Sequence, residues 1–162
     1  MSKSIDSDNI KNIASYHIKN VRNLLSKKKD IRIILGANNT KERDYPRLKD
    51  CFDIEVEYVR ITAEGEVDLE DLGNRLEHSD VKTLVSLMHV NNEVGNKLDI
   101  KKVALLCKQN NALFHSDTVQ SIGHYELDLK EIPVDFTAVS AHKFHGPKGV
   151  GFAFIRKNSG LK

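Results

Sequence analysis

The stretch TAVSAHKFHGPKGVGFAFIRK, residues 137–157, contains the features that decide the fold. Small and apolar residues lead to one lysine, Lys143, and a glycine–proline turn is followed by a second apolar run. The link between the two runs is only a few residues long, which favours an antiparallel return over a crossover connection. Because an unpaired lysine is costly to bury, the place of Lys143 at the end of an expected strand needs a chemical explanation.

Upstream of this stretch, apolar runs alternate with helical patterns. We expect strands at residues 31–35, 54–61, 81–90, 112–117, 134–141 and 150–156. Helices are expected over about residues 10–25, after an N-cap at Asp68, and over 99–111 after an N-cap at Asp99. This alternation predicts an α/β fold, a three-layer α/β/α sandwich with a mainly parallel sheet and an antiparallel strand after the lysine.

Composition excludes several classes of protein. The 162 residues suffice for one domain, and 40% hydrophobic and 30% charged residues are typical of a soluble globular chain. A net charge of +2 gives no support for binding to nucleic acid or a membrane surface. The first residues carry no signal peptide, and Cys51 and Cys107 are too few for a disulfide framework, so we expect a cytoplasmic protein. Cys107 lies on the expected buried face of a helix and is interpreted as a core residue.

Three of the expected strands end in polar side chains. The strand at 81–90 leads to His89, Asn91, Asn92 and Glu93, the strand at 112–117 to His115, Asp117 and Gln120, and the strand at 134–141 to Ser140, His142 and Lys143. Ligands of open α/β sheets bind at the carboxyl ends of parallel strands, where these groups would meet. Each residue alone is most often a helix cap, a turn former or a structural residue. Together they supply complementary chemistry.

That chemistry suits an aldehyde cofactor. A lysine amine at the rim of an apolar sheet can act as a nucleophile toward an aldehyde. Pyridoxal phosphate (PLP) also needs a carboxylate for its ring nitrogen, donors for its ring oxygen and donors for its phosphate. Asp117 suits the first requirement and Gln120 the second. Ser140 and His142 suit the third, and Asn92 could serve the ring or the substrate.

Three motifs carry a resemblance to a known family. MHVNNEVG (88–95), HSDTVQSIG (115–123) and SAHKFHGPKGVG (140–151) resemble, in order and spacing, the cofactor motifs of cysteine desulfurases. Those enzymes belong to the class V aminotransferase branch of fold-type I PLP enzymes. The likeness is specific over residues 81–156, and as a domain the chain matches well over 54–162 and loosely over 1–53.

The resemblance implies roles for six residues. Lys143 would form the Schiff base with PLP and remove the proton from the alpha carbon of the substrate. The other implied cofactor contacts are Asp117 at the ring nitrogen, Gln120 at the ring oxygen, Ser140 and His142 at the phosphate, and Asn92 at the polar edge of the ring. His89 and His115 belong to the strand pattern, and neither is assigned a catalytic role.

The N-terminal part departs from the family pattern. Asn39 stands near the place where the family has a histidine stacked on the ring, and no histidine occurs between His17 and His78. Residues 2–9 resemble the phosphate loop of the family, with Ile5 in place of a threonine, and isoleucine has no hydroxyl to offer a phosphate.

The C-terminal part also departs. The chain ends 19 residues after Lys143 (162 − 143 = 19), before the family's persulfide-forming cysteine, its substrate-binding arginine and its small C-terminal domain. We therefore expect residues 1–162 to form the central part of the PLP-binding large domain. As a fragment, split gene product or decaying copy, it would not convert L-cysteine to L-alanine and persulfide alone.

Further expectations follow from the resemblance, and alternatives stay open. Family members are homodimers that act on L-cysteine and pass sulfur to acceptor proteins, as in iron–sulfur cluster assembly. The chain could instead come from another class V enzyme, such as a selenocysteine lyase or an aminotransferase. It could also be a non-catalytic pseudoenzyme that binds a partner. A zinc site built from His115, Asp117, His142 and His145 is a further alternative, because imidazole and carboxylate groups suit that metal.

Overall fold

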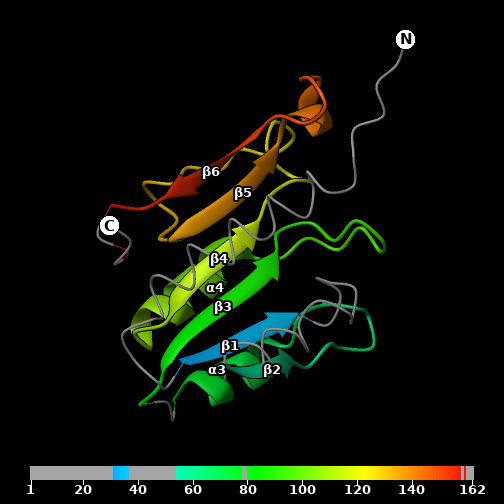
Figure 1. The fold of residues 1–162 in the computed structure, drawn as a ribbon. Coiled ribbons are helices and arrows are strands. Elements are labelled where there is room, and N and C mark those ends of the chain that lie inside the picture. The colour runs from blue at the N-terminus through cyan, green and yellow to red at the C-terminus, as the bar shows by residue number, and fades with distance from the viewer. Residues whose placement is uncertain (1–30, 37–53, 78–79, 158, 160–162) are drawn as a thin grey trace.

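The central feature is one six-stranded sheet. The structure, a computed structural model, describes residues 31–36, 54–77, 80–157 and 159. The strands are β1 (Ile31–Gly36), β2 (Glu55–Val59), β3 (Lys82–Met88), β4 (Leu113–Asp117), β5 (Phe136–Ser140) and β6 (Gly151–Ile155), in the order β2-β1-β3-β4-β5-β6 (Figure 1). All neighbours are parallel except β5 and β6, which are antiparallel. The mainly parallel sheet and the antiparallel return after the lysine are confirmed.

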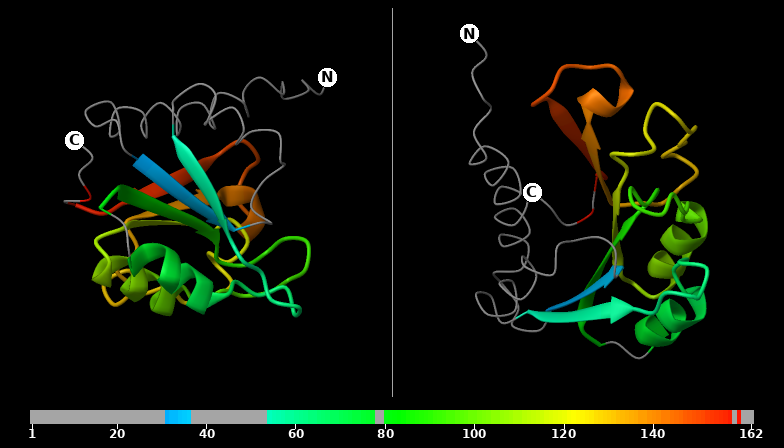
Figure 2. Two further views of the ribbon diagram at one scale, coloured as in Figure 1. Left: turned by 90° about the horizontal axis from the view of Figure 1, so that it is seen from below. Right: turned by 90° about the vertical axis from the view of Figure 1, so that its right-hand side faces the viewer.

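Within the described residues, two helices cover one face of this sheet. They are α3 (Leu69–Glu77) and α4 (Ile100–Gln109), and both lie on the same side of the strands (Figure 2). Asp68 Oδ1 accepts the N–H of Asp71 at 3.0 Å, and Asp99 Oδ1 accepts the N–H of Lys102 at 3.0 Å. Both predicted N-caps are therefore confirmed. The helix expected over residues 10–25 lies outside the described residues.

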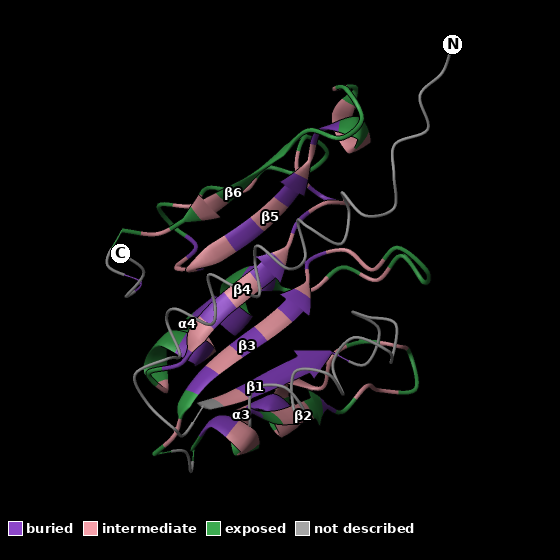
Figure 3. Ribbon diagram, in the orientation of Figure 1, coloured by how far each residue is buried: buried purple, intermediate pink, exposed green. Residues whose placement is uncertain are grey.

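The main core lies between the sheet and these helices. Alternate residues of the strands point to this face and are buried, among them Ile34, Val85 and Phe114, each 0% exposed (Figure 3). They pack against the apolar stripes of the helices, including Leu72 and Val103. Burial of this apolar surface is the main favourable term in folding, so the apolar runs of the sequence account for the sheet.

The opposite face of the sheet changes character across its width. Near β1 it is apolar, with Ile33, Leu35 and Ile54 buried in a second cluster. Across β3 and β4 it becomes polar, because Ser86 is in register with His115 on that face. Side chains alternate along a strand, so the next position on this face of β4 is Asp117.

Two expected strands end earlier than the sequence pattern indicated. β2 ends at Val59 and β3 at Met88, although the alternating pattern of residues 54–61 and the apolar run of residues 81–90 predict strands that continue to Ile61 and Val90. Beyond these ends the chain folds back on itself through short antiparallel bridges, Ile61 with Val67 and Val90 with Lys97. Ile61 and Val90 therefore pair with residues a few positions further along the chain and not with a neighbouring strand.

The strand before Lys143, β5, also ends earlier than the sequence pattern predicts. β5 stops at Ser140, and Ala141–Phe144 form a single 3₁₀ turn, η1. Lys143 therefore lies on this turn and not on the strand. None of the described helices has the length and apolar character needed to cross a membrane.

Candidate active site

The three polar motifs lie at one edge of the sheet. β3, β4 and β5 are adjacent and parallel, and the register pairs Met88 with Asp117 and Asp117 with Ala138. The carboxyl ends of the three strands therefore lie side by side (Figure 1). The prediction that their polar residues share one edge is confirmed for the strands that carry them.

Asp117 occupies the middle of this edge. It is the last residue of β4, and its Oδ1 accepts the N–H of Val119 at 2.9 Å. Burial raises the pKa of the Asp117 carboxyl above its ordinary value, while the Val119 hydrogen bond acts in the opposite direction. Its Oδ2 accepts no hydrogen bond from any residue that the structure describes. A cationic or N–H donor at this oxygen would offset the cost of burial.

Lys143 lies on the neighbouring turn. Its side chain is half-buried, and its Nζ makes no hydrogen bond or ion pair within the described part of the chain. The turn around it is tightly built, since Gly146 donates its N–H to the Ala141 carbonyl at 2.9 Å. A Cβ on Gly146 would lie 2.7 Å from the Cβ of Ala141, so only glycine fits this approach. The amine is thus carried by a compact turn.

Ser140 and His142 stand together before the lysine. Ser140 Oγ is 2.8 Å from His142 Nδ1, so the two side chains are hydrogen-bonded to each other. A hydroxyl and an imidazole so arranged can both serve an anion such as phosphate.

The two predicted amide contacts come from the loops after β3 and β4. Asn92 Nδ2 donates to Glu93 Oε1 at 2.6 Å, in a loop shaped by Asn91, whose Oδ1 accepts the N–H groups of Glu93 and Val94 at 2.8 and 3.0 Å. Gln120 is half-buried three residues after Asp117, and its side chain makes no hydrogen bond with another described residue. Both amides belong to loops at the same sheet edge as Asp117.

Two residues that tie the loops together were missed in the sequence. Thr118 is fully buried, and both its N–H and its Oγ1 donate to the Ala138 carbonyl, at 3.1 and 2.9 Å. His124 Nε2 lies 2.9 Å from the main-chain oxygen of Lys143. No local sequence signal marks either contact, because each joins residues about twenty positions apart.

The histidines of the strands have other surroundings. His115 Nδ1 is 2.8 Å from Ser86 Oγ on the neighbouring strand. His89 is buried, and burial, followed by the charge of Lys97, lowers its pKa. Its Nδ1 has no hydrogen-bond partner among the residues described.

A metal site finds no support in this geometry. Within the described ranges no group of three or more His, Cys, Asp and Glu side chains gathers in a way that could hold a metal ion. The zinc alternative built on His115, Asp117, His142 and His145 falls within those ranges. These four residues therefore do not form a metal-binding cluster.

Cys107 is confirmed as a core residue. It is 1% exposed, and burial, with a smaller contribution from Asp135, raises the pKa of its thiol to about 12. A thiol that is neither accessible nor ionised is a poor nucleophile. Predictions that concern Ile5, Asn39 and Cys51 lie outside the described residues.

A cavity lies beside the Asn92 loop. It has a volume of about 240 Å³ at the ends of β1 and β3, and Gly36, Met88, Asn91 and Lys97 are among the residues that line it. None of its lining residues is Asp117, Gln120, Ser140, His142 or Lys143. The cavity is thus a neighbour of the polar edge and not the same site.

The fold and the polar edge together define an α/β domain that offers a ligand site at the carboxyl ends of parallel strands. The aminotransferase class-V family model matches residues 12–161, and the chain belongs to this family.

Individual relatives agree with this assignment. The chain is 35% identical to the cysteine desulfurase IscS of Haemophilus influenzae over 158 aligned residues. These residues are 96% of this chain and 37% of the relative. The IscS of Clostridium botulinum is 46% identical over 101 residues, 62% of this chain and 25% of the relative. A NifS-like protein from Rickettsia africae is similar in structure, with a TM-score of 0.68 and 30% identity over 83% of this chain and 37% of that chain. The chain thus spans little more than a third of these relatives at most. The predicted resemblance to cysteine desulfurases is confirmed.

Proposed function

We propose that this chain is the central, PLP-binding part of the large domain of a cysteine desulfurase. The observation that carries the proposal is Asp117, a carboxyl with a raised pKa and one oxygen without a partner among the described residues, at the sheet edge that also presents Lys143. A carboxyl in this state is stabilised by a protonated ring nitrogen. The similarity to cysteine desulfurases supports the identity of that ligand.

The residues at this edge fit the groups of the cofactor. Lys143 would hold it covalently through Nζ, and Asp117 would pair with its ring nitrogen. Gln120 would bond the ring oxygen. The hydrogen-bonded pair of Ser140 and His142 would receive the phosphate. Asn92, on the β3 side, would serve the polar edge of the ring.

The chemistry is then divided between the cofactor and the chain. When bound, PLP supplies an electron sink for negative charge at the alpha carbon of an amino acid. Asp117, ionised, would pair with the ring nitrogen and hold its proton. The amine of Lys143 would be the base that takes the proton from the alpha carbon.

The proposed overall reaction moves one sulfur atom. L-cysteine and a thiol, RSH, give L-alanine and a persulfide, RSSH, so the carbon–sulfur bond breaks and a sulfur–sulfur bond forms without an external oxidant. Cys107 is not that thiol, because it is buried and its pKa is raised to about 12. The accepting thiol must therefore come from outside the described residues or from another chain. Pairing as a homodimer and passage of sulfur to an acceptor protein for iron–sulfur cluster assembly are proposed from the relatives alone.

Covalent trapping tests the cofactor site. The purified chain is incubated with PLP, reduced with borohydride and mapped by peptide mass. We expect a pyridoxyl group on Lys143, its loss in Lys143→Ala, and its retention in Lys148→Ala, an exposed lysine five residues further on. Labelling spread evenly over surface lysines, with Lys143 not preferred, would contradict the proposal.

A further inference from the structure

We infer that His124 is a positioning residue for Lys143, an inference that rests on the proposed function. His124 lies in the loop after β4, and its Nε2 is 2.9 Å from the carbonyl oxygen of Lys143. Because a carbonyl can only accept, Nε2 carries the proton and donates it. His124 is not among the proposed cofactor contacts, so it acts through the residue that is.

The hydrogen bond meets a need of the turn itself. Lys143 belongs to η1, a single 3₁₀ turn of four residues. The last carbonyls of a helical turn have no partner within the turn, and histidine side chains near such an end can satisfy them. Within the described residues, His124 is the donor that reaches the Lys143 carbonyl. The bond fixes the backbone from which the lysine side chain starts.

The residue before His124 allows the approach. Gly123 has a φ of 80°, a conformation that favours glycine. A Cβ at this position would lie 2.8 Å from the Cβ of Phe144, the residue that follows Lys143. The loop backbone therefore contacts η1 directly, and His124 adds a polar link beside this contact.

His124 belongs to the loop between β4 and β5, which begins after Asp117. At the start of this loop Thr118 donates two hydrogen bonds to Ala138 of β5, and six residues further on His124 donates to Lys143. The loop is thus joined to the β5 segment at two points. The separation between the proposed partner of the ring nitrogen and the proposed anchoring amine is set by these links. A binding constellation requires such support to hold its geometry.

Three variants of the 162-residue chain test this inference. His124→Ala removes the donor, His124→Gln keeps an amide N–H at the position of Nε2, and Glu126→Ala changes an exposed residue of the same loop. The first readout is hydrogen exchange of His145 and Gly146 without PLP, since both amides donate to the Ala141 carbonyl of the turn. The second is the PLP concentration that half-saturates borohydride labelling of Lys143.

We expect exchange roughly fivefold faster, and a half-saturating concentration roughly fivefold higher, in His124→Ala, the change that one lost hydrogen bond produces. His124→Gln and Glu126→Ala should stay close to the unchanged chain in both readouts. Equal exchange in His124→Ala and the unchanged chain, or no recovery in His124→Gln, would overturn the inference. If the unchanged chain shows no labelling of Lys143, the proposed function fails, while the exchange data still decide whether His124 holds the turn.

Discussion

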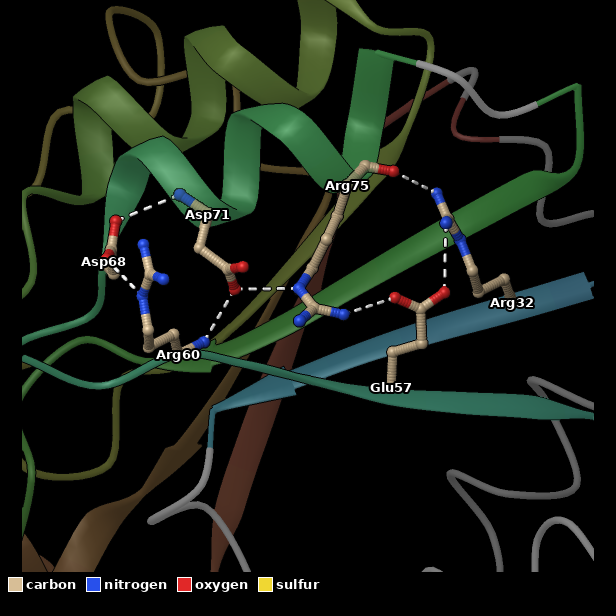
Figure 4. A network of polar contacts seen from close by, with 6 residues as sticks. All are labelled: Arg32, Glu57, Arg60, Asp68, Asp71 and Arg75. Carbon is tan, nitrogen blue, oxygen red and sulfur yellow. Dashed lines mark hydrogen bonds and ion pairs between the residues drawn. The ribbon is translucent and has the colours of Figure 1, made fainter.

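Charged side chains are paired at one edge of the sheet, on the β1–β2 side, and remain unpaired among the described residues at another, formed by the carboxyl ends of β4 and β5. At the β1–β2 edge, six residues form a connected network of ion pairs and hydrogen bonds, Arg32, Glu57, Arg60, Asp68, Asp71 and Arg75 (Figure 4). Glu57 lies between two guanidinium groups, with Oε1 3.0 Å from Arg32 and Oε2 2.6 Å from Arg75. Arg75 in turn bonds Asp71 at 2.8 Å. Every carboxylate of this network has an arginine or main-chain N–H partner.

At the carboxyl ends of β4 and β5, charged groups remain without a partner inside the described chain. Among those residues, Asp117 has one oxygen that accepts no hydrogen bond, and Lys143 forms no ion pair. The pKa values reflect the difference. The pKa of Asp71 is lowered, chiefly by the hydrogen bond from Arg75, whereas the pKa of Asp117 is raised, chiefly by burial. The first edge contributes to stability, whereas the charged groups of the second are the ones proposed to bind a ligand.

Two glycines allow the packing of the two regions to be compared. A Cβ on Gly151 of β6 would clash with the Val139 carbonyl oxygen, while a Cβ on Gly73 of α3 would meet no described atom within 4 Å. Gly151→Ala should therefore lower the free energy of unfolding by about 3 kcal/mol. Gly73→Ala should raise it by about 0.5 kcal/mol, because alanine favours the helix. Urea denaturation measures both free energies, and equal effects would contradict a close contact between β5 and β6 at Gly151.

The ion-pair network provides the next largest effect. Glu57→Ala leaves Arg32 and Arg75 without their shared carboxylate, and the Arg32 side chain is only 12% exposed. We expect a loss of about 2 kcal/mol in the free energy of unfolding, with labelling of Lys143 by PLP unchanged in the folded variant. Glu55→Ala, on an exposed residue of the same strand, is the control. Lost labelling in a still folded Glu57→Ala variant would show that the two edges are coupled.

The smallest effect concerns the outer surfaces of the two edge strands. Phe152 of β6 is 56% exposed and Tyr58 of β2 is 44% exposed. Val150, just before β6, and Ile155, at its end, are also more than half exposed. Phe152→Lys should reduce self-association in sedimentation velocity, with a change of a few tenths of a kcal/mol in stability. Tyr58→Lys should reduce self-association less than Phe152→Lys does. Equal reductions would contradict the expectation that the chains associate through β6.

The strands of the sheet, and the edge at which Asp117 and Lys143 meet, can be predicted from the sequence. Buried apolar runs predict the strands, and the short Gly146–Pro147 link predicts the antiparallel return. The rule that parallel strands share one carboxyl edge places Asp117 and Lys143 at the same edge of the sheet. These inferences succeed because they depend on local pattern and on strand direction alone.

Other features depend on contacts between distant residues. Arg32 and Glu57 are 25 positions apart, and their pairing requires the register of β1 against β2. The contact of His124 with Lys143 likewise requires a particular loop path. The 3₁₀ turn under Lys143 was also missed, because the run of small and apolar residues before it continues the strand pattern. Local periodicity carries no information on these points.

The most direct test of the contrast is Asp117→Asn, measured by urea unfolding with and without PLP. Asparagine keeps an acceptor for the Val119 N–H but removes the charge that burial disfavours. Because the folded-state pKa of Asp117 is raised, its stabilising contribution is present below the pKa of the unfolded chain and is lost as pH rises through the folded value. Without PLP, the variant should match the unchanged chain at about pH 3 and be more stable at about pH 7.

The increase in the free energy of unfolding that PLP causes at about pH 7 should be larger for the unchanged chain than for Asp117→Asn. The unchanged chain should be stabilised by the bound cofactor, whereas Asp117→Asn, which has no carboxylate for the ring nitrogen, should gain less. A variant that is less stable than the unchanged chain without PLP, or that gains as much from PLP, would contradict the claim that this edge keeps its charge for a ligand.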